Sequence, residues 1–168
     1  MPDDVTIRPV SPDDAAAVCA ILDAVIVNGS QSLLDTPFSL DDERRYIEAF
    51  PGAGVFLVAE AGDEGVVAFQ SLEPYGSFGT HAFDHVLTIG TYVREDRRRR
   101  GIGRTLAEAS FAGARRRGGE RIVTEVRMDN DGALGFYFSL GFAVAGVLRE
   151  LARIGGRSID VALLERRL

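Results

Sequence analysis

Four consecutive arginines, Arg97 to Arg100, stand directly before Gly101-Ile102-Gly103 in a chain of 168 residues whose formal net charge is −6. Glycine lets a backbone approach phosphate oxygens closely, and the N–H groups and dipole of a helix's first turn favour an anion at that end. Arginine adds charge-assisted hydrogen bonds to phosphate. The alternative is a solvated run of charge, but four cations at a helix N-terminus are unfavourable on dipole grounds alone. We therefore expect this turn to bind a pyrophosphate.

Two common nucleotide-binding motifs do not fit this turn. A P-loop requires a lysine after its second glycine, and the chain contains no lysine. The dinucleotide fingerprint requires a third glycine at the position where Leu106 stands. The anion is therefore not expected to be a nucleotide triphosphate or a dinucleotide.

The elements that must position this turn alternate between strand-like and helix-like patterns. Near-continuous apolar runs and period-two alternation predict strands, and apolar residues at helical spacing between capping residues predict helices. The predicted strands are 5–10, 54–61, 65–72, 86–93, 121–128, 142–151 and 158–168, and the predicted helices are 14–26, 40–50, 101–117 and 131–140. This order predicts an α/β (α+β) fold in a single domain, 1–168, with a mixed sheet of six to seven strands and helices on both faces.

Two local features of these elements carry further expectations. Gly90 interrupts the apolar run 86–93, and a glycine inside a strand marks a bulge or a close approach of a ligand or another backbone. In the helix 40–50, the spacing predicts that Leu40, Tyr46, Ile47 and Phe50 face the core.

The bulk composition limits the classes of function. No apolar run is long enough to cross a membrane, and the start of the chain lacks the pattern of a secretion signal, so a cytoplasmic protein with no membrane contact is expected. The acidic excess argues against nucleic-acid binding. No metal site is expected.

The turn resembles the acyl-CoA-binding signature of the GCN5-related N-acetyltransferases (the GNAT family). Arg98, Gly101 and Gly103 match Arg/Gln-x-x-Gly-x-Gly/Ala, and "VTIRPVSPDD", "MDNDGALGFYFSLGF" and the tail from Gly146 resemble three more segments of the family in the correct order. The resemblance implies the GNAT fold, in which two parallel strands, here 86–93 and 121–127, splay apart to form the acyl-CoA cleft.

The resemblance also implies roles for individual residues. Tyr137 matches the general acid, and a backbone N–H of a bulged strand, that of Val93, is implied as the oxyanion donor. Asn130 is implied to contact the CoA arm, although Asp129-Asn130 also suits a helix N-cap. The implied acetyl-CoA-binding residues are Thr91, Tyr92, Val93, Arg98, Arg99, Arg100, Gly101, Ile102, Gly103, Arg104, Thr105 and Asn130.

The sequence leaves the identity of the general base open. After the first predicted helix, "SLLDTPFSLDD" resembles the bacterial phosphinothricin-type and amino-acid N-acyltransferases, which carry a Glu in the central strand where this chain has Thr88. The candidates here are Glu73, His81, Asp84, His85 and a water relay.

The acceptor pocket is expected between the segments 28–39 and 73–85. Their aromatic residues favour a small acceptor or are ordinary packing: Phe38, Tyr75, Phe78 and Phe83. The function implied is transfer of an acetyl group from acetyl-CoA to a primary amine of a small molecule, an amino acid or a similar compound. The alternatives are acetylation of a protein or peptide and a non-catalytic acyl-CoA-binding module; a homodimer is possible.

Overall fold

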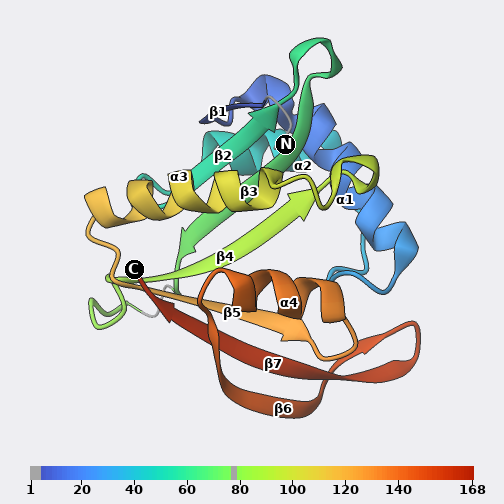
Figure 1. The fold of residues 1–168 in the computed structure, drawn as a ribbon, viewed down its shortest axis with the longest axis vertical. Helices are drawn as coiled ribbons and strands as arrows, with labels where there is room; N and C mark the ends of the chain where they lie inside the picture. Colours follow the sequence, from blue (N-terminus) through green and yellow to red (C-terminus); the bar gives the residue numbers. More distant parts are fainter. Residues whose placement is uncertain (1–4, 77–78) are drawn as a thin grey trace.

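The computed structural model describes residues 5–76 and 79–168, which form a seven-stranded mixed sheet with helices on both faces (Figure 1). The strand order is β1-β2-β3-β4-β5-β7-β6; β4 and β5 are parallel, and the other neighbours are antiparallel. The strands are β1 (Thr6–Pro9), β2 (Val55–Glu60), β3 (Val66–Pro74), β4 (Val86–Val93), β5 (Arg121–Arg127), β6 (Ala143–Ile154) and β7 (Arg157–Arg167). The helices are α1 (Ala15–Asn28), α2 (Leu40–Glu48), α3 (Ile102–Arg116) and α4 (Asp131–Ser139), with short 3-10 turns η1 (Pro12–Asp14), η2 (Gly62–Glu64) and η3 (Glu95–Arg97). The predicted fold class is confirmed.

Each face of the sheet buries its own apolar core. Side chains alternate across a strand, so Phe56 and Val58 of β2 pack with α1 and α2, whereas Val55 packs with α3 on the opposite face. Figure 1 shows α3 and α4 in front of the sheet and α1 and α2 behind it. The carboxyl end of β4 lies in a cleft between α3 and α4.

The parallel strands β4 and β5 separate soon after they begin. They pair only at Val86↔Arg121, Leu87↔Ile122 and Thr88↔Val123, although both strands continue further. Just beyond the last pair, Thr124 Oγ1 donates a hydrogen bond to the carbonyl oxygen of Ile89 at 3.0 Å. A side-chain hydrogen bond thus replaces the backbone hydrogen bonds between β4 and β5 at the point where the two strands separate.

Gly90 does not form a bulge. The register between β3 and β4 runs without interruption from Pro74↔Leu87 to Ala68↔Val93. A Cβ added at Gly90 would come within 3.2 Å of the Tyr92 ring, so the glycine leaves room for that ring. The expectation of a bulged strand is wrong, and the group that approaches this glycine is a side chain, the Tyr92 ring, rather than another backbone.

The α2 helix is rotated relative to the predicted core face. Leu40 is 45% exposed, whereas Ile47 is buried as predicted and Glu43 is only 5% exposed. Tyr46 is 37% exposed, but its ring contacts Phe50 edge-on and Phe56 in a tilted arrangement. The hydrophobic pattern therefore identifies the helix but misplaces its first turn, which lies at the surface.

Candidate active site

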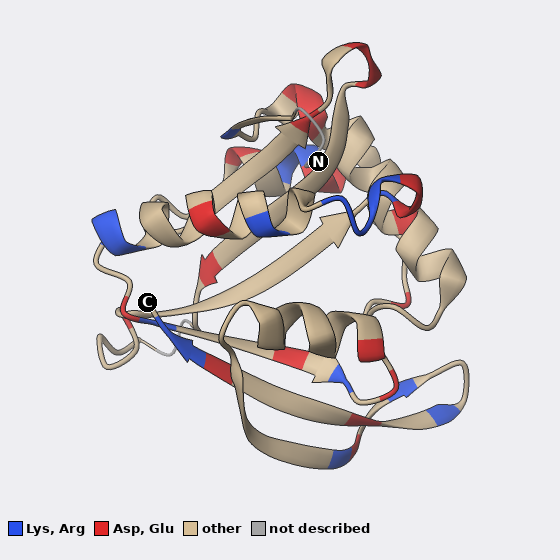
Figure 2. Cartoon of the chain, viewed as in Figure 1, with Lys and Arg blue, Asp and Glu red and all other residues tan. Residues whose placement is uncertain are grey.

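The loop between β4 and α3 forms a concave backbone surface with concentrated positive charge. Arg99 has φ +59° and Gly101 has φ +85°, both in the left-handed region, and Gly101 is the N-cap of α3. Successive N–H groups in such a turn point into one concavity that suits an anion, and the helix dipole has the same sign there. Figure 2 shows this loop as a run of arginine at the end of β4.

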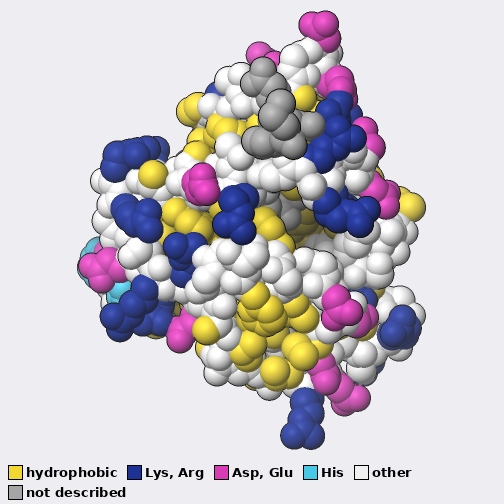
Figure 3. Space-filling view, in the orientation of Figure 1, with side chains coloured by type: hydrophobic (Ala, Val, Ile, Leu, Met, Phe, Trp, Pro, Cys, Tyr) yellow, Lys and Arg dark blue, Asp and Glu magenta, His cyan; other side chains and the backbone are white. Residues whose placement is uncertain are grey.

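A cleft of about 770 Å³ lies beside this loop, between β4, α3 and α4. Figure 3 shows a hollow in the face of the molecule with arginine side chains on its rim. Most of the predicted cofactor residues line the cleft: Thr91, Tyr92, Val93, Arg98, Arg99, Gly101, Ile102, Gly103, Arg104 and Asn130, together with Tyr137. The structure therefore brings together residues from four separate segments of the chain.

Two predicted cofactor residues do not line this cleft. Thr105 directs its hydroxyl to the carbonyl oxygen of Gly101 at 3.3 Å, within the first turn of its own helix. Arg100 is exposed and does not line the cleft. The motif spacing alone could not separate the residues that line the cleft from those that do not.

The β4 backbone presents alternate peptide groups to the widened gap. The N–H of Arg94 bonds to Val67 and that of Tyr75 bonds to the carbonyl of Val86, so the even-numbered residues of β4 pair with β3. Because hydrogen bonding alternates along an antiparallel strand, the N–H groups of Thr91 and Val93 point toward β5. The Val93 N–H thus faces the cleft without the bulge that was expected.

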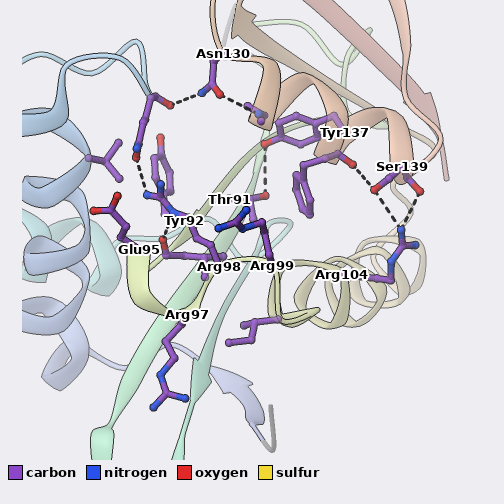
Figure 4. Close-up of a pocket in the computed structure, with 18 of the residues that line it drawn as sticks. Thr91, Tyr92, Glu95, Arg97, Arg98, Arg99, Arg104, Asn130, Tyr137 and Ser139 are labelled. Carbon is purple, nitrogen blue, oxygen red and sulfur yellow. Dashed lines mark hydrogen bonds between the residues drawn. The ribbon is translucent and has the colours of Figure 1, made fainter. Parts of the chain in front are cut away.

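The arginines of the loop differ in what they contact. Arg98 donates through Nε to the carbonyl of Val93 at 3.1 Å and through Nη2 to Oε1 of Gln31 at 2.6 Å. Arg97 forms an ion pair with Glu64, and its side chain points away from the other labelled residues in Figure 4. Arg98 is therefore the arginine that fixes the inner side of the loop.

Asn130 joins three parts of the site. Its Oδ1 accepts from the N–H of Ala133 at 3.0 Å, which caps α4, and its Nδ2 donates to the carbonyl of Gln31 at 3.0 Å. The N-cap interpretation is correct, and the side chain also lies in the wall of the cleft.

Tyr137 lies on α4 with its phenol directed at β4. Its Oη donates to Oγ1 of Thr91 at 3.4 Å, and its ring packs edge-on against Phe136 and Phe142 (Figure 4). Burial raises the pKa of Tyr137 to about 12, and hydrogen bonds with Thr91 and Thr124 partly oppose that increase. The phenol is therefore protonated at neutral pH and has a polar partner in the cleft.

A second cavity of about 160 Å³ adjoins the first. The two share six lining residues: Gln31, Thr91, Tyr92, Asn130, Ala133 and Tyr137. The second cavity is lined further by 32–34 from the loop after α1, by Gly90, and by Glu125 and Arg127 of β5. The prediction that the segment 28–39 walls a pocket is therefore correct.

Arg127 is a buried cation whose hydrogen bonds hold the wall of this cavity in place. It forms a bidentate pair with Asp129 at 2.6 and 2.8 Å and donates to the carbonyls of Gly29 and Ser32 at 2.8 and 3.1 Å. The hydrogen bond to Asp129 raises the pKa of Arg127 and lowers that of Asp129. The loop after α1 is thereby attached to the end of β5.

The segment 73–85 lines neither cavity in its described residues. Glu73 accepts a hydrogen bond from Tyr46 at 2.5 Å, and the highly exposed His81 pairs with Asp84 at 2.9 Å. Tyr75 and Phe83 contact each other edge-on, and Phe78 lies outside the described residues. None of the four side chains named as candidate bases, including His85, therefore lines either cavity.

Three contributors to the site were not predicted from the sequence. Gln31, Ser139 and Arg127 are single polar residues with no motif around them, yet Gln31 contacts both Arg98 and Asn130, and Ser139 accepts from Arg104. Arg127 could have been suspected because it lies near the end of the predicted strand 121–128, two residues before Asp129.

The chain belongs to the acetyltransferase (GNAT) family, whose sequence model matches residues 28–142. The predicted enzyme class is thus confirmed.

Curated relatives and a solved structure match almost the whole chain. It is 25% identical over 165 residues to L-methionine sulfoximine/L-methionine sulfone acetyltransferase of Pseudomonas paraeruginosa, covering 97% of this chain and 94% of the relative. It is 29% identical over 167 residues to phosphinothricin N-acetyltransferase of Streptomyces viridochromogenes, covering 96% and 87%. The fold matches yncA from Salmonella typhimurium, determined with its cofactor acetyl-CoA, with a TM-score of 0.89, 24% identity and coverage of 98% and 94%.

No helix within 5–76 and 79–168 has the length and apolar character needed to cross a membrane. The same part of the chain has no group of three His, Cys, Asp or Glu side chains placed to hold a metal ion.

Proposed function

We propose that the protein transfers an acetyl group from acetyl-CoA to the primary amine of a small molecule, an amino acid or a similar compound. The observation that carries the proposal is that the two cavities meet at Thr91 and Tyr137, between β4 and α4. One cavity has the charge and backbone geometry for a CoA phosphate arm, and the other has room for a small acceptor. The relatives named as acetyltransferases of amino-acid-like compounds support the same substrate class.

The larger cleft fits acetyl-CoA on two counts. The left-handed Arg99 and Gly101 and the N-terminus of α3 suit a pyrophosphate. The N–H groups of Thr91 and Val93 suit the amide-rich pantetheine arm, which an extended strand can pair with. Gly103 also lines the cleft, and a Cβ there would come within 3.0 Å of the Phe136 ring, so glycine lets α3 lie close to α4 at this point. When bound, acetyl-CoA supplies the acetyl group and a thiolate leaving group.

The residues at the meeting point of the cavities supply the remaining chemistry. The Val93 N–H is placed to stabilise negative charge on the thioester oxygen, because a fixed backbone donor costs no reorganisation in the transition state. Tyr137 is placed to protonate the leaving thiolate, since its phenol is held protonated in a site from which most water is excluded. Asn130 and Arg98 hold the two sides of the cleft through Gln31.

The proton of the amine is proposed to leave through water. None of the four candidate bases lines either cavity, and the second cavity is polar enough at Thr91, Ser32 and Glu125 to hold ordered water. A water relay is therefore the base most consistent with this arrangement.

A turnover assay with acetyl-CoA tests the proposed function. Release of free thiol is measured with amino acids, methionine sulfoximine, phosphinothricin, polyamines and N-terminal peptides as acceptors. Turnover with one or more small amines is expected. Binding of CoA without turnover on any amine would instead support a non-catalytic acyl-CoA-binding module. Turnover confined to peptides would indicate that the acceptor is a protein or peptide.

A homodimer formed through β6 is also proposed. β6 is an edge strand of the sheet and exposes apolar side chains: Val144, Val147, Leu148 and Leu151, each about half exposed. Figure 3 shows hydrophobic side chains gathered below the hollow, over the region of α4 and β6. An open edge with an apolar patch favours association. We expect a dimer by light scattering and a monomer for the double variant Leu148→Glu/Leu151→Glu; a monomeric wild type contradicts the proposal.

A cytoplasmic location stays a prediction of the sequence.

A further inference from the structure

A buried amide lies behind the meeting point of the two cavities. Gln70, on β3, is directly opposite Thr91 of β4 in the sheet register and has no exposed surface. Its Nε2 donates to Oγ1 of Thr91 at 2.8 Å. Its Oε1 is buried without a hydrogen-bond partner in the described part of the chain.

An unpartnered buried oxygen is costly for folding. Leaving such a group unsatisfied costs about 1–3 kcal/mol, whereas an apolar side chain of similar shape avoids the cost. Gln70 contacts Thr91, a residue of the proposed catalytic centre. Packing alone therefore does not explain why this buried position holds an amide side chain. The explanation lies in what the amide does to Thr91.

The Thr91 hydroxyl has two lone pairs and one proton. Oγ1 accepts from Gln70 Nε2 and from Tyr137 Oη, so both lone pairs are engaged by donors. The hydroxyl proton of Thr91 is therefore not donated to Gln70 or to Tyr137. If Gln70 presented its oxygen instead, that proton would be held by the amide.

We propose that Gln70 is a positioning residue for acetyl transfer, which fixes the direction of the Thr91 hydroxyl so that Thr91 can donate to Tyr137 once the tyrosine has lost its proton. The inference rests on the proposed function, because it concerns the general acid of that reaction. Burial by itself disfavours a phenolate, so a donor at Thr91 lowers the barrier to proton release.

The step balances without any further reactant. The amine nitrogen forms a bond to the acetyl carbon as the carbon–sulfur bond breaks, and the thiolate takes the Tyr137 proton. The nitrogen releases its extra proton to water, and the Tyr137 phenolate takes a proton back from water. Thr91 and Gln70 change no bonds; they only hold the phenolate oxygen while it is charged.

The test compares Gln70→Met with Ser110→Ala. Ser110, on α3, is also fully buried with an unpartnered oxygen, but it lines neither cavity, so it is a matched control. Gln70→Met should lower kcat about tenfold, the effect of one hydrogen bond to a charged group, with KM for acetyl-CoA within about twofold of wild type. Ser110→Ala should leave kcat unchanged. A kcat for Gln70→Met equal to that of the wild type would overturn the inference.

A double-mutant cycle separates positioning from packing. Gln70→Met added to Tyr137→Phe should lower kcat no further, because the group that Gln70 serves is already gone. If the kcat of the double variant falls by the product of the two single-variant reductions, Gln70 acts independently of Tyr137, and the proposal is contradicted.

If Gln70→Met does not fold, a second pair of variants tests the same inference. Thr91→Ser retains the hydroxyl and should keep kcat within about threefold, whereas Thr91→Val should lose about tenfold or more. Equal activity of the two variants would overturn the inference. A folded wild type that transfers no acetyl group to any amine would contradict the proposed function itself, whereas an active wild type with an unaffected Gln70→Met contradicts only the role of Gln70.

Discussion

Arg98 Nη2 and Gln31 Oε1 lie 2.6 Å apart, although the two residues are separated by 67 positions in the chain. This contact joins the arginine-rich loop after β4 to the loop after α1, and Asn130 reaches the same glutamine through its backbone carbonyl. The proposed cofactor side and the proposed acceptor side therefore share one hydrogen-bonded residue.

The first prediction concerns this link. Gln31→Ala should raise KM for acetyl-CoA roughly tenfold, since a hydrogen bond to a charged group contributes about 1.5–3 kcal/mol. Ser30→Ala, an exposed neighbour, is the control and should leave KM unchanged. Steady-state kinetics at saturating acceptor distinguish the two; an unchanged KM in Gln31→Ala would mean that Arg98 needs no support from this loop.

The second prediction concerns the proposed general acid. Tyr137→Phe should lower kcat about 10²- to 10⁴-fold with little change in KM for acetyl-CoA, because the phenol acts only as the thiolate leaves. Tyr46→Phe removes a phenol outside both cavities and should retain kcat. Thiol release is measured for both variants, and a Tyr137→Phe enzyme with wild-type kcat would transfer the acid role to another group.

The third prediction compares two glycines. A Cβ at Gly103 would lie 3.0 Å from the Phe136 ring, whereas a Cβ at Gly135, in α4, meets nothing within 4 Å. Gly103→Ala should lower the free energy of unfolding by about 1 kcal/mol or more and weaken acetyl-CoA binding. Gly135→Ala should raise that free energy by about 0.5–1 kcal/mol. Urea unfolding and calorimetric titration measure the two effects, and equal behaviour of the variants would contradict the packing argument.

The fourth prediction concerns stability in acid. Asp14, which is buried, accepts two hydrogen bonds from Arg8 at 2.7 and 2.8 Å and one from the N–H of Ser11 at 2.8 Å. The side-chain hydrogen bond from Arg8 is the main cause that lowers the pKa of Asp14 below its usual value. The stabilisation is therefore complete above the unfolded-state pKa of about 4 and is lost as pH falls through the folded-state pKa.

Asp14→Asn should be less stable than wild type at pH 7, and the difference should shrink as pH falls below about 4. The free energy of unfolding is measured in urea at several pH values. Asp13→Asn, an exposed neighbour, should show no comparable loss at pH 7. A stability difference for Asp14→Asn that is constant with pH would contradict the role of the ion pair.

The sequence predicted the elements well because their signals are local. Gly29 ends α1 in the left-handed conformation, Ser39 caps α2 and Asn130 caps α4, as capping rules anticipate. The loop from Arg98 to Gly103 was found because its glycines and arginines are consecutive.

Features that depend on packing between distant segments were missed. Gln70 and Gln31 resemble ordinary polar residues until the sheet and the loop after α1 bring them to Thr91 and Arg98. Glu43 is buried where the pattern favoured Leu40, because the start of α2 lies at the surface. The side chains of the segment 73–85 were expected at the acceptor site, but the described ones contact each other or α2 instead.

Calorimetric titration of the folded wild type with acetyl-CoA and with S-acetylpantetheine, which lacks all the phosphates, tests the central claim most directly. The arrangement of Arg98, Arg99 and Gly101 at the N-terminus of α3 predicts one acetyl-CoA per chain and much weaker binding of the phosphate-free compound. No binding of acetyl-CoA, or equal affinity for the two compounds, would contradict the assignment of this cleft to the acyl donor.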